Sequence, residues 1–240
     1  MKPTNIFMTG DWRDLIMTTF EIDKDILDPY LPKGTEIDLY NNKALLSMVG
    51  FTFSKVKFYD FKVPFHQDFG QINFRFYVKS KIDSTKGVVF IKEFAPKPLI
   101  TLVANLVYNE PYFNKNITNN KSITDNNISL EYNHNGAKTS AQANLTTFEA
   151  QKNTLELFVV DRYVAFIKNK KSETLQYKIF HKPWQLYNLD TSYFDNELLN
   201  LLPITFKNIK HVSTCFVDGS SVEVKKGLLQ QAKNVVVNSI

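Results

Sequence analysis

Apolar and polar residues alternate strictly along residues 71–79, which is the clearest pattern in the chain. One face of this segment would carry Ile72, Phe74, Phe76 and Val78, and the other Asn73, Arg75, Tyr77 and Lys79. A period of two predicts a β-strand that presents a different set of side chains on each face. The turn residues Thr85-Lys86-Gly87 lead into an apolar segment at 88–94, so the two segments predict a β-hairpin.

Other segments also predict short strands, most of them in pairs around a turn. Strand pairs are expected at 128–132 with 139–145, at 163–167 with 175–181 and at 211–217 with 222–224, and a single strand at 43–53. The connecting turns contain Asn135-Gly136, Lys170-Lys171 and Asp218-Gly219, and Asn-Gly is the strongest hairpin signal among them.

Three segments predict short helices. In 99–107 the apolar residues recur at intervals of three and four, as they do on one face of a helix. Segments 155–160 and 196–202 are shorter, and residues 114–127, rich in Asn, Lys and Thr, predict a flexible surface loop. Strands outnumber helices, so the pattern predicts an α+β, mostly β fold: a curved antiparallel sheet with a few short helices packed on it.

The composition favours one folded domain over residues 1–240. The hydrophobic fraction is 43%, with 20 Phe and 11 Tyr, which suits strands around a large interior. The single Cys215 excludes an internal disulfide and predicts an inert core residue rather than a metal ligand. No apolar run approaches the roughly 20 residues of a membrane span, and the first residues lack a signal-peptide pattern. We therefore expect a cytoplasmic protein that does not bind membranes.

The positive charge raises the question of a nucleic-acid partner. The net charge is +5, but almost all of the cations are Lys, and the only arginines are Arg13, Arg75 and Arg162. Proteins that read bases and phosphates depend on the bidentate guanidinium group, so we expect no nucleic-acid binding. The three arginines instead become candidates for positions that need a planar, permanently charged group.

Seven segments, in this order, carry a resemblance to a known family. They are Trp12-Arg13-Asp14-Leu15, Tyr30-Leu31-Pro32, 72–78, Gly87-Val88-Val89-Phe90, Pro111-Tyr112, 158–163 and His181-Lys182-Pro183-Trp184. Over about residues 12–190 the chain resembles the uncharacterised YqjF-like family of the acetoacetate-decarboxylase-like superfamily. The resemblance implies a curved antiparallel sheet closed into a cone or barrel with a pocket inside. It gives no reason to expect a cofactor, and it leaves the oligomeric state open.

A better-known relative in that superfamily decarboxylates a β-keto acid through a lysine Schiff base. The comparable stretch here runs from Lys92 to Pro98, and Lys97 takes the place of the nucleophile. Pro98 stands where the relative has its activating second lysine, and a lysine with a pKa of about 10.4 is protonated at neutral pH. Burial or Lys92 could lower that pKa; alternatively, Lys97 is an ordinary exposed loop residue. Gln71 is a second departure, since relatives often carry Glu there.

Arg75 and Glu93 lie on neighbouring predicted strands and allow two interpretations. They could form a cross-strand ion pair, worth roughly 0.2–1 kcal/mol. Alternatively, both charges face the interior, where Arg75 would bind a substrate carboxylate and Glu93 would serve as an acid. Under the second interpretation Asn73 and Tyr77 join the pocket wall, and Lys97 stands at its mouth.

His181 and Trp184 follow a strand end and are further candidate ligand-binding residues. His181 could act as a general base, but no Ser or Cys lies in a nucleophile motif beside it, so the pattern favours a structural histidine. Trp12 and Trp184 could stack on a ligand or fill the core. His134 and His66 fall in a turn and a loop, which gives no support for a metal site.

The leading hypothesis is a pocketed domain that binds a small organic acid or an apolar metabolite. The first alternative is a carbon–carbon lyase that uses a Lys97 Schiff base with Glu93. The second is a non-catalytic structural or protein-interaction module with a filled barrel. That module would have Arg75 and Glu93 paired only with each other, and no cavity of the ~300 Å³ typical of ligand sites.

Overall fold

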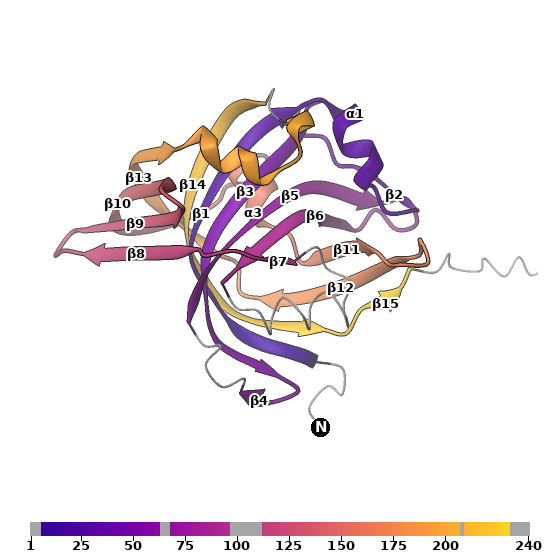
Figure 1. Cartoon of the computed structure of the whole chain (residues 1–240), viewed down its shortest axis with the longest axis horizontal. Coiled ribbons are helices and arrows are strands. Elements are labelled where there is room, and N and C mark those ends of the chain that lie inside the picture. Colours follow the sequence, from indigo (N-terminus) through magenta and orange to yellow (C-terminus); the bar gives the residue numbers. More distant parts are fainter. Residues whose placement is uncertain (1–5, 63–67, 97–111, 207–208, 231–240) are drawn as a thin grey trace, which may run out of the picture.

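The computed structural model describes residues 6–62, 68–96, 112–206 and 209–230, and these residues form a strongly curved sheet with short helices (Figure 1). The strands are β1 (Ile6–Ile22), β2 (Thr35–Ile37), β3 (Ala44–Phe58), β4 (Phe61–Lys62), β5 (Phe69–Ser80), β6 (Lys86–Ala95), β7 (Tyr112–Asn114), β8 (Thr118–Ile123), β9 (Asn127–His134), β10 (Ala137–Glu149), β11 (Val164–Lys168), β12 (Thr174–His181), β13 (Gln185–Phe194), β14 (Lys210–Lys225) and β15 (Leu228–Leu229). The helices are α1 (Lys24–Leu27), α3 (Leu155–Val160) and the 3-10 helices η1 (Asp28–Tyr30), η3 (Asn196–Leu201) and η4 (Ile204–Phe206).

Seven strands close into a ring in the order β1-β14-β12-β11-β6-β5-β3. The ring closes where β12 pairs with β14, from Ile179 opposite Val224 to His181 opposite Val222. Most pairings are antiparallel, as the sequence predicts, but β6 pairs in parallel with β11 and with β7, so the sheet is mixed. The sheet continues from β14 through β13, β10 and β9 to β8, and these last strands project to the left of the ring in Figure 1.

Apolar side chains gather in two clusters, one on each side of the ring strands. The outer cluster contains Ile72, Phe74, Phe76 and Val78 of β5, together with residues of β9, β10 and η3. The inner cluster contains Tyr77 of β5, and α3 adds Val159 and Val160 to it. The predicted alternation along 71–79 is thus confirmed, but both faces of β5 are buried from Phe69 to Val78. Polar residues of the inner face consequently lie inside the ring.

Several predicted elements are confirmed. β5 and β6 form the expected antiparallel hairpin, as do β9 with β10 and β11 with β12. Asn135 and Gly136 have φ values of 52° and 94°, as a type I′ turn requires. The helices expected at 155–160 and 196–202 correspond to α3 and η3. The helix expected at 99–107 lies outside the described residues.

Two local predictions are wrong. Residues 118–123, expected in a flexible loop, form the exposed strand β8, because β9 offers them a hydrogen-bonding partner along its whole length. Asp218-Gly219 is not a turn, since β14 continues through it. Gly219 has a φ of 77° and faces Arg13 in the β1–β14 ladder, so the glycine bends the strand instead of reversing it.

Replacing Gly219 tests this bend. A Cβ atom at Gly219 would lie 2.1 Å from the backbone oxygen of Trp12, and its positive φ disfavours any L side chain. We expect Gly219→Ala to lower the free energy of unfolding by roughly 2–3 kcal/mol in urea titrations. Gly136→Ala is the matched control, because its φ is also positive but no atom lies within 4 Å of the added Cβ. Equal losses in the two variants would contradict the steric argument.

Candidate functional site

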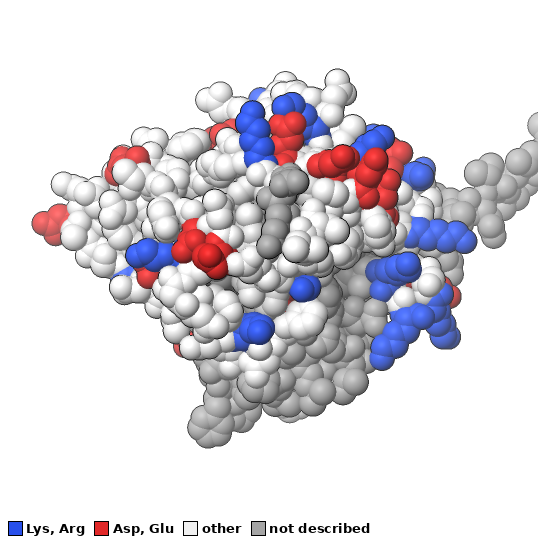
Figure 2. All heavy atoms as spheres, turned by 45° about the horizontal axis from the view of Figure 1, so that its top comes forward, with Lys and Arg blue, Asp and Glu red and all other residues white. Residues whose placement is uncertain are grey.

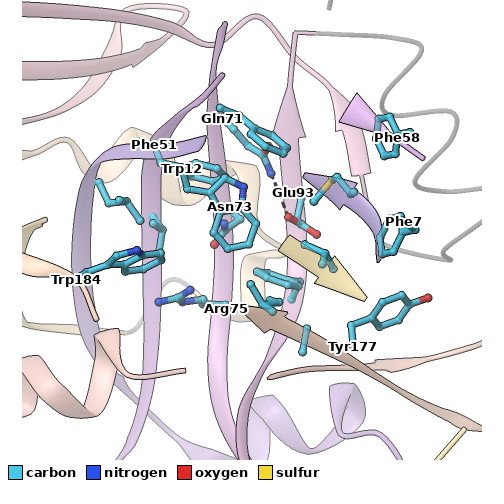
Figure 3. Close-up of a pocket in the computed structure, with 18 residues that line it drawn as sticks. Phe7, Trp12, Phe51, Phe58, Gln71, Asn73, Arg75, Glu93, Tyr177 and Trp184 are labelled. Atoms are coloured by element: carbon cyan, nitrogen blue, oxygen red, sulfur yellow. Dashed lines mark hydrogen bonds between the residues drawn. The ribbon is translucent and has the colours of Figure 1, made fainter. Parts of the chain in front are cut away.

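The inside of the ring contains a cavity of about 70 Å³ (Figure 3). Its walls are mainly aromatic, with Trp12, Phe51, Phe53, Phe90, Tyr177 and Trp184 among the lining residues. The volume is below the ~300 Å³ typical of drug-sized ligand sites. Judged by the space that one buried water occupies, the cavity has room for a few waters or for a compound of about six non-hydrogen atoms.

One wall of the cavity is polar. Gln71, Asn73 and Arg75 reach it from β5, because residues two apart point to the same face of a strand. Glu93 of β6 joins them from the position directly opposite Asn73. Gln71 Nε2 donates a hydrogen bond of 3.1 Å to Glu93 Oε2, drawn as a dashed line in Figure 3. All four side chains are buried, so the cavity offers a concentrated set of donors and acceptors in an apolar surrounding.

Arg75 does not pair with Glu93, which removes the cross-strand ion pair as an explanation of these two charges. Its partner across the hairpin is Phe90, and in Figure 3 its guanidinium extends toward Trp184, away from Glu93. Nη2 donates to the backbone oxygen of Val159 at 3.0 Å and lies 4.0 Å from Met17 Sδ. Within the described residues, Arg75 Nε has no hydrogen-bond partner and no carboxylate lies within ion-pair distance. Burial lowers the pKa of Arg75, and the nearby Tyr77 hydroxyl partly offsets this.

Arg162 shows how the same protein satisfies a buried arginine. Arg162 Nη1 binds Asp38 Oδ2 at 2.7 Å, and both side chains are buried. Arg162 Nε donates to the oxygen of Phe158 at the end of α3, and the guanidinium stacks over the Phe158 ring. Arg162 therefore fixes the end of α3, and its acidic partner is Asp38, which follows β2. Arg75 lacks such a carboxylate among the residues that the structure describes.

Two more polar atoms in the cavity wall are buried without a hydrogen bond in the described part of the chain. They are Trp12 Nε1, a donor, and Asn73 Oδ1, an acceptor. Leaving such a group unsatisfied costs about 1–3 kcal/mol, so the wall favours an occupant that supplies complementary partners. Trp184 differs, because its Nε1 donates to Ser220 Oγ at 3.0 Å.

His181 and Tyr77, both expected in the pocket wall, do not line the cavity. The His181 ring lies behind Trp184, with ring centres 4.3 Å apart and an angle of 18° between the planes. Tyr77 is fully buried beside the wall, and its hydroxyl lies 2.6 Å from Ser47 Oγ. Strand periodicity alone places Tyr77 on the correct face but does not say how far along the strand the cavity extends.

The remaining candidate residues lie elsewhere. Lys97 and His66 are outside the described residues. Lys92 points to the face of β6 opposite Glu93 and donates to the oxygen of Leu201, so it does not face the cavity. Burial raises the pKa of Cys215 to about 12, which fits the expected inert core thiol. Within the described ranges, no three His, Cys, Asp or Glu side chains are placed to hold a metal ion.

Sequence reasoning omitted Gln71 from this wall and left Trp12 open between ligand stacking and core packing. Gln71 shares the face of Asn73 and Arg75, so the period of two was a sufficient signal for it. Trp12 had no such signal, because its position depends on how β1 crosses the ring and meets Phe51 and Trp184.

Surface charges are mixed on the face in Figure 2, where Lys and Arg side chains along the upper edge lie beside Asp and Glu. Ion pairs among the described residues include Lys43 with Glu21 and Lys79 with Glu36. The expected absence of nucleic-acid binding stays a prediction. None of the helices in the described segments is long and apolar enough to cross a membrane.

The chain is similar in sequence to uncharacterised proteins. Residues 9–219 match the family DUF2071, described as an uncharacterized conserved protein. The uncharacterized protein YqjF of Bacillus subtilis (strain 168) is 26% identical over 207 residues, which cover 82% of each chain.

Solved structures of the acetoacetate-decarboxylase type have the same fold. An acetoacetate decarboxylase from Legionella pneumophila superposes with a TM-score of 0.64 at 12% identity, over 95% of this chain and 88% of that one. The enduracididine biosynthesis enzyme MppR, complexed with pyruvate, superposes with a TM-score of 0.61 at 12% identity, over 97% of this chain and 92% of the enzyme. The expected acetoacetate-decarboxylase-like fold is thus confirmed.

The contrast between Arg75 and Arg162 predicts opposite effects on stability. Arg75 is a buried charge without a carboxylate partner, so its desolvation cost is not repaid. Arg75→Met removes that cost with an apolar side chain of similar length and should keep or raise the free energy of unfolding. Asp38→Asn strips the charge that balances Arg162 and should cost about 3 kcal/mol. Urea unfolding followed by circular dichroism measures both. A loss in Arg75→Met as large as that in Asp38→Asn would mark Arg75 as a structural group.

Proposed function

The chain belongs to the DUF2071 family, and on that premise we propose that it binds a compact organic acid inside the ring, with Arg75 holding the carboxylate. The observation that carries the proposal is the buried Arg75, whose Nε has no partner and whose charge has no carboxylate in contact within the described residues. A buried cation is costly unless an anion and hydrogen bonds compensate it. A ligand carboxylate provides both.

The cavity also limits what the acid looks like. Its volume of about 70 Å³ accommodates roughly six non-hydrogen atoms, the size of a three- or four-carbon acid. Trp12 Nε1 can donate to a carbonyl or hydroxyl oxygen, and Asn73 Oδ1 can accept from a hydroxyl. These groups favour a short keto or hydroxy acid over a purely apolar metabolite. The pyruvate complex of MppR supports this choice through the shared fold.

A lyase activity is the second candidate, and the position of Glu93 favours it. Glu93 lies in the cavity wall near the end of β6, four residues before Lys97 in the chain. Formation of a Schiff base between the Lys97 amine and the keto carbon of a bound acid would release water. The likeness to acetoacetate decarboxylase supports this candidate at the level of fold.

Binding of pyruvate tests the first proposal directly. We expect calorimetry to detect pyruvate binding, and Arg75→Gln to weaken it by about 10- to 100-fold, because a hydrogen bond to a charged group contributes roughly 1.5–3 kcal/mol. Pyruvamide, which lacks the carboxylate, should bind the wild-type protein as weakly as pyruvate binds the variant. Arg13→Gln is the matched control, since Arg13 is exposed and does not line the cavity. Unchanged affinity in Arg75→Gln would remove Arg75 as the carboxylate site.

Borohydride trapping tests the lyase. If Lys97 forms a Schiff base, incubation with pyruvate and borohydride should add the reduced acid to the peptide that contains Lys97, and mass spectrometry will locate it. Lys97→Ala should abolish the adduct, while Lys92→Ala should retain it, because Lys92 points away from the cavity. Binding of pyruvate without any lysine adduct would reject the lyase and leave the binding function.

A further inference from the structure

His181 occupies the middle of a stack of three rings directly behind the cavity wall. The Tyr163 ring lies on one side, with centres 4.5 Å apart and planes at 28°, and Trp184 lies on the other at 4.3 Å and 18°. Trp184 in turn lines the cavity and contacts Trp12 edge to face, with ring centres 6.4 Å apart. The imidazole therefore supports the aromatic wall without touching the cavity itself.

The hydrogen bonds of His181 determine its neutral form. Nδ1 lies 2.8 Å from the backbone oxygen of Lys182, and because a carbonyl oxygen only accepts, Nδ1 carries the proton. The lone pair is then on Nε2, which is buried and has no hydrogen-bond partner in the part of the chain that the structure describes. The backbone groups of Lys182 and Arg162 both favour the charged ring.

Several charges act on this ring, and Arg75 is the one that also lines the cavity. Burial and the positive charge of Arg75 lower the pKa of His181, while Asp161 and the backbone groups of Lys182 and Arg162 raise it. The Tyr163 hydroxyl stays neutral, because burial and Asp161 raise its pKa to about 12. The Arg162 guanidinium is balanced by Asp38. The charge of Arg75 therefore acts both on the cavity and on His181.

We infer that His181 is a positioning residue whose protonation is coupled to the occupation of the cavity by an anion, so that the protein takes up a proton when the acid binds. This inference rests on the proposed function, because the anion acts by neutralising Arg75. By reciprocity, the protonated protein binds the anion more tightly. The cavity then fills preferentially as the pH falls.

The direction and size of the pH effect follow from linkage. In the free protein the pKa of His181 lies below its ordinary value of 6.5. A bound carboxylate cancels part of the positive field of Arg75 and so raises the pKa of His181. The affinity for the acid therefore increases as the pH falls from the His181 pKa of the bound protein to that of the free protein. Each unit of difference corresponds to a tenfold gain in affinity between the high-pH and low-pH limits. The ligand carboxylate stays ionised above about pH 5, so its own titration does not contribute.

The coupling is measured first without any ligand. Titration of the histidine ring signals by NMR gives the pKa of His181, identified by its loss in His181→Gln. We expect Arg75→Gln to raise this pKa, because the repelling charge is gone. Arg13→Gln is the control and should leave it unchanged. An unchanged His181 pKa in Arg75→Gln would overturn the inference whatever the ligand does.

The linkage to binding is measured with pyruvate as the probe. We expect saturating pyruvate to raise the His181 pKa, and the affinity of the wild-type protein to be several-fold higher at pH 5.5 than at pH 8. His181→Phe keeps a flat ring in the stack but cannot titrate, so its affinity should be the same at both pH values. His134→Asn, which changes a half-buried histidine that does not line the cavity, should keep the wild-type pH dependence.

The outcomes separate the two proposals. Binding of pyruvate without a shift of the His181 pKa, or a wild-type pH dependence in His181→Phe, would overturn the coupling while the binding function stands. Failure of pyruvate and other short acids to bind the wild-type protein would count against the binding function and against proton uptake on binding. The Arg75→Gln titration would then still decide whether the two charges interact.

Discussion

Strand β5 has no solvent-exposed face, and the interior of the ring depends on that constraint. Its outer face packs Phe74 and Phe76 beneath the flanking strands, and its inner face closes the ring. Since side chains alternate along a strand, burying the apolar face on the outside forces Gln71, Asn73 and Arg75 to the inside. A polar wall within an aromatic cavity is therefore a consequence of how the sheet closes. The polar residues of β5 cost stability where they are, which gives them a role that core packing does not explain.

The two buried arginines show that this cost is not inherent to the fold. Arg162 has a carboxylate, a helix-end carbonyl and an aromatic ring around it, so its charge is compensated on every side. Arg75 has one backbone carbonyl, a sulfur atom and the Tyr77 hydroxyl near it but no carboxylate, and its Nε has no acceptor among the described residues. Met or Leu at position 75 would fill the interior of the ring without a cost in stability. The uncompensated guanidinium is the strongest physical argument that the ring interior receives an anion.

The sequence allowed the strands, most hairpins and the polar face of β5 to be predicted, because each depends on local periodicity or turn chemistry. Asn135-Gly136 shows this well, since the type I′ turn requires positive φ at both residues. Asp218-Gly219 carries a similar signal, yet the long ladder between β1 and β14 overrides it. In the site, Asn73, Arg75, Glu93 and Trp184 were predicted and do line the cavity. Other features depend on strand register and ring closure, which no local pattern encodes. They are the lack of pairing between Arg75 and Glu93, the presence of Trp12 in the cavity wall and the position of His181 behind it.

The same short segment closes the ring and supports the cavity wall, which explains how charge and binding can be coupled without movement. His181 pairs with Val222 at the closing ladder, and three residues later Trp184 lies against it before β13 begins. Trp184 is held by the His181 ring, by the edge of Trp12 and by its hydrogen bond to Ser220, so it has little freedom to rearrange. A rigid wall in a region of low dielectric transmits a charge change through space more strongly than water would. Coupling between Arg75 and His181 therefore needs only the field of the bound anion.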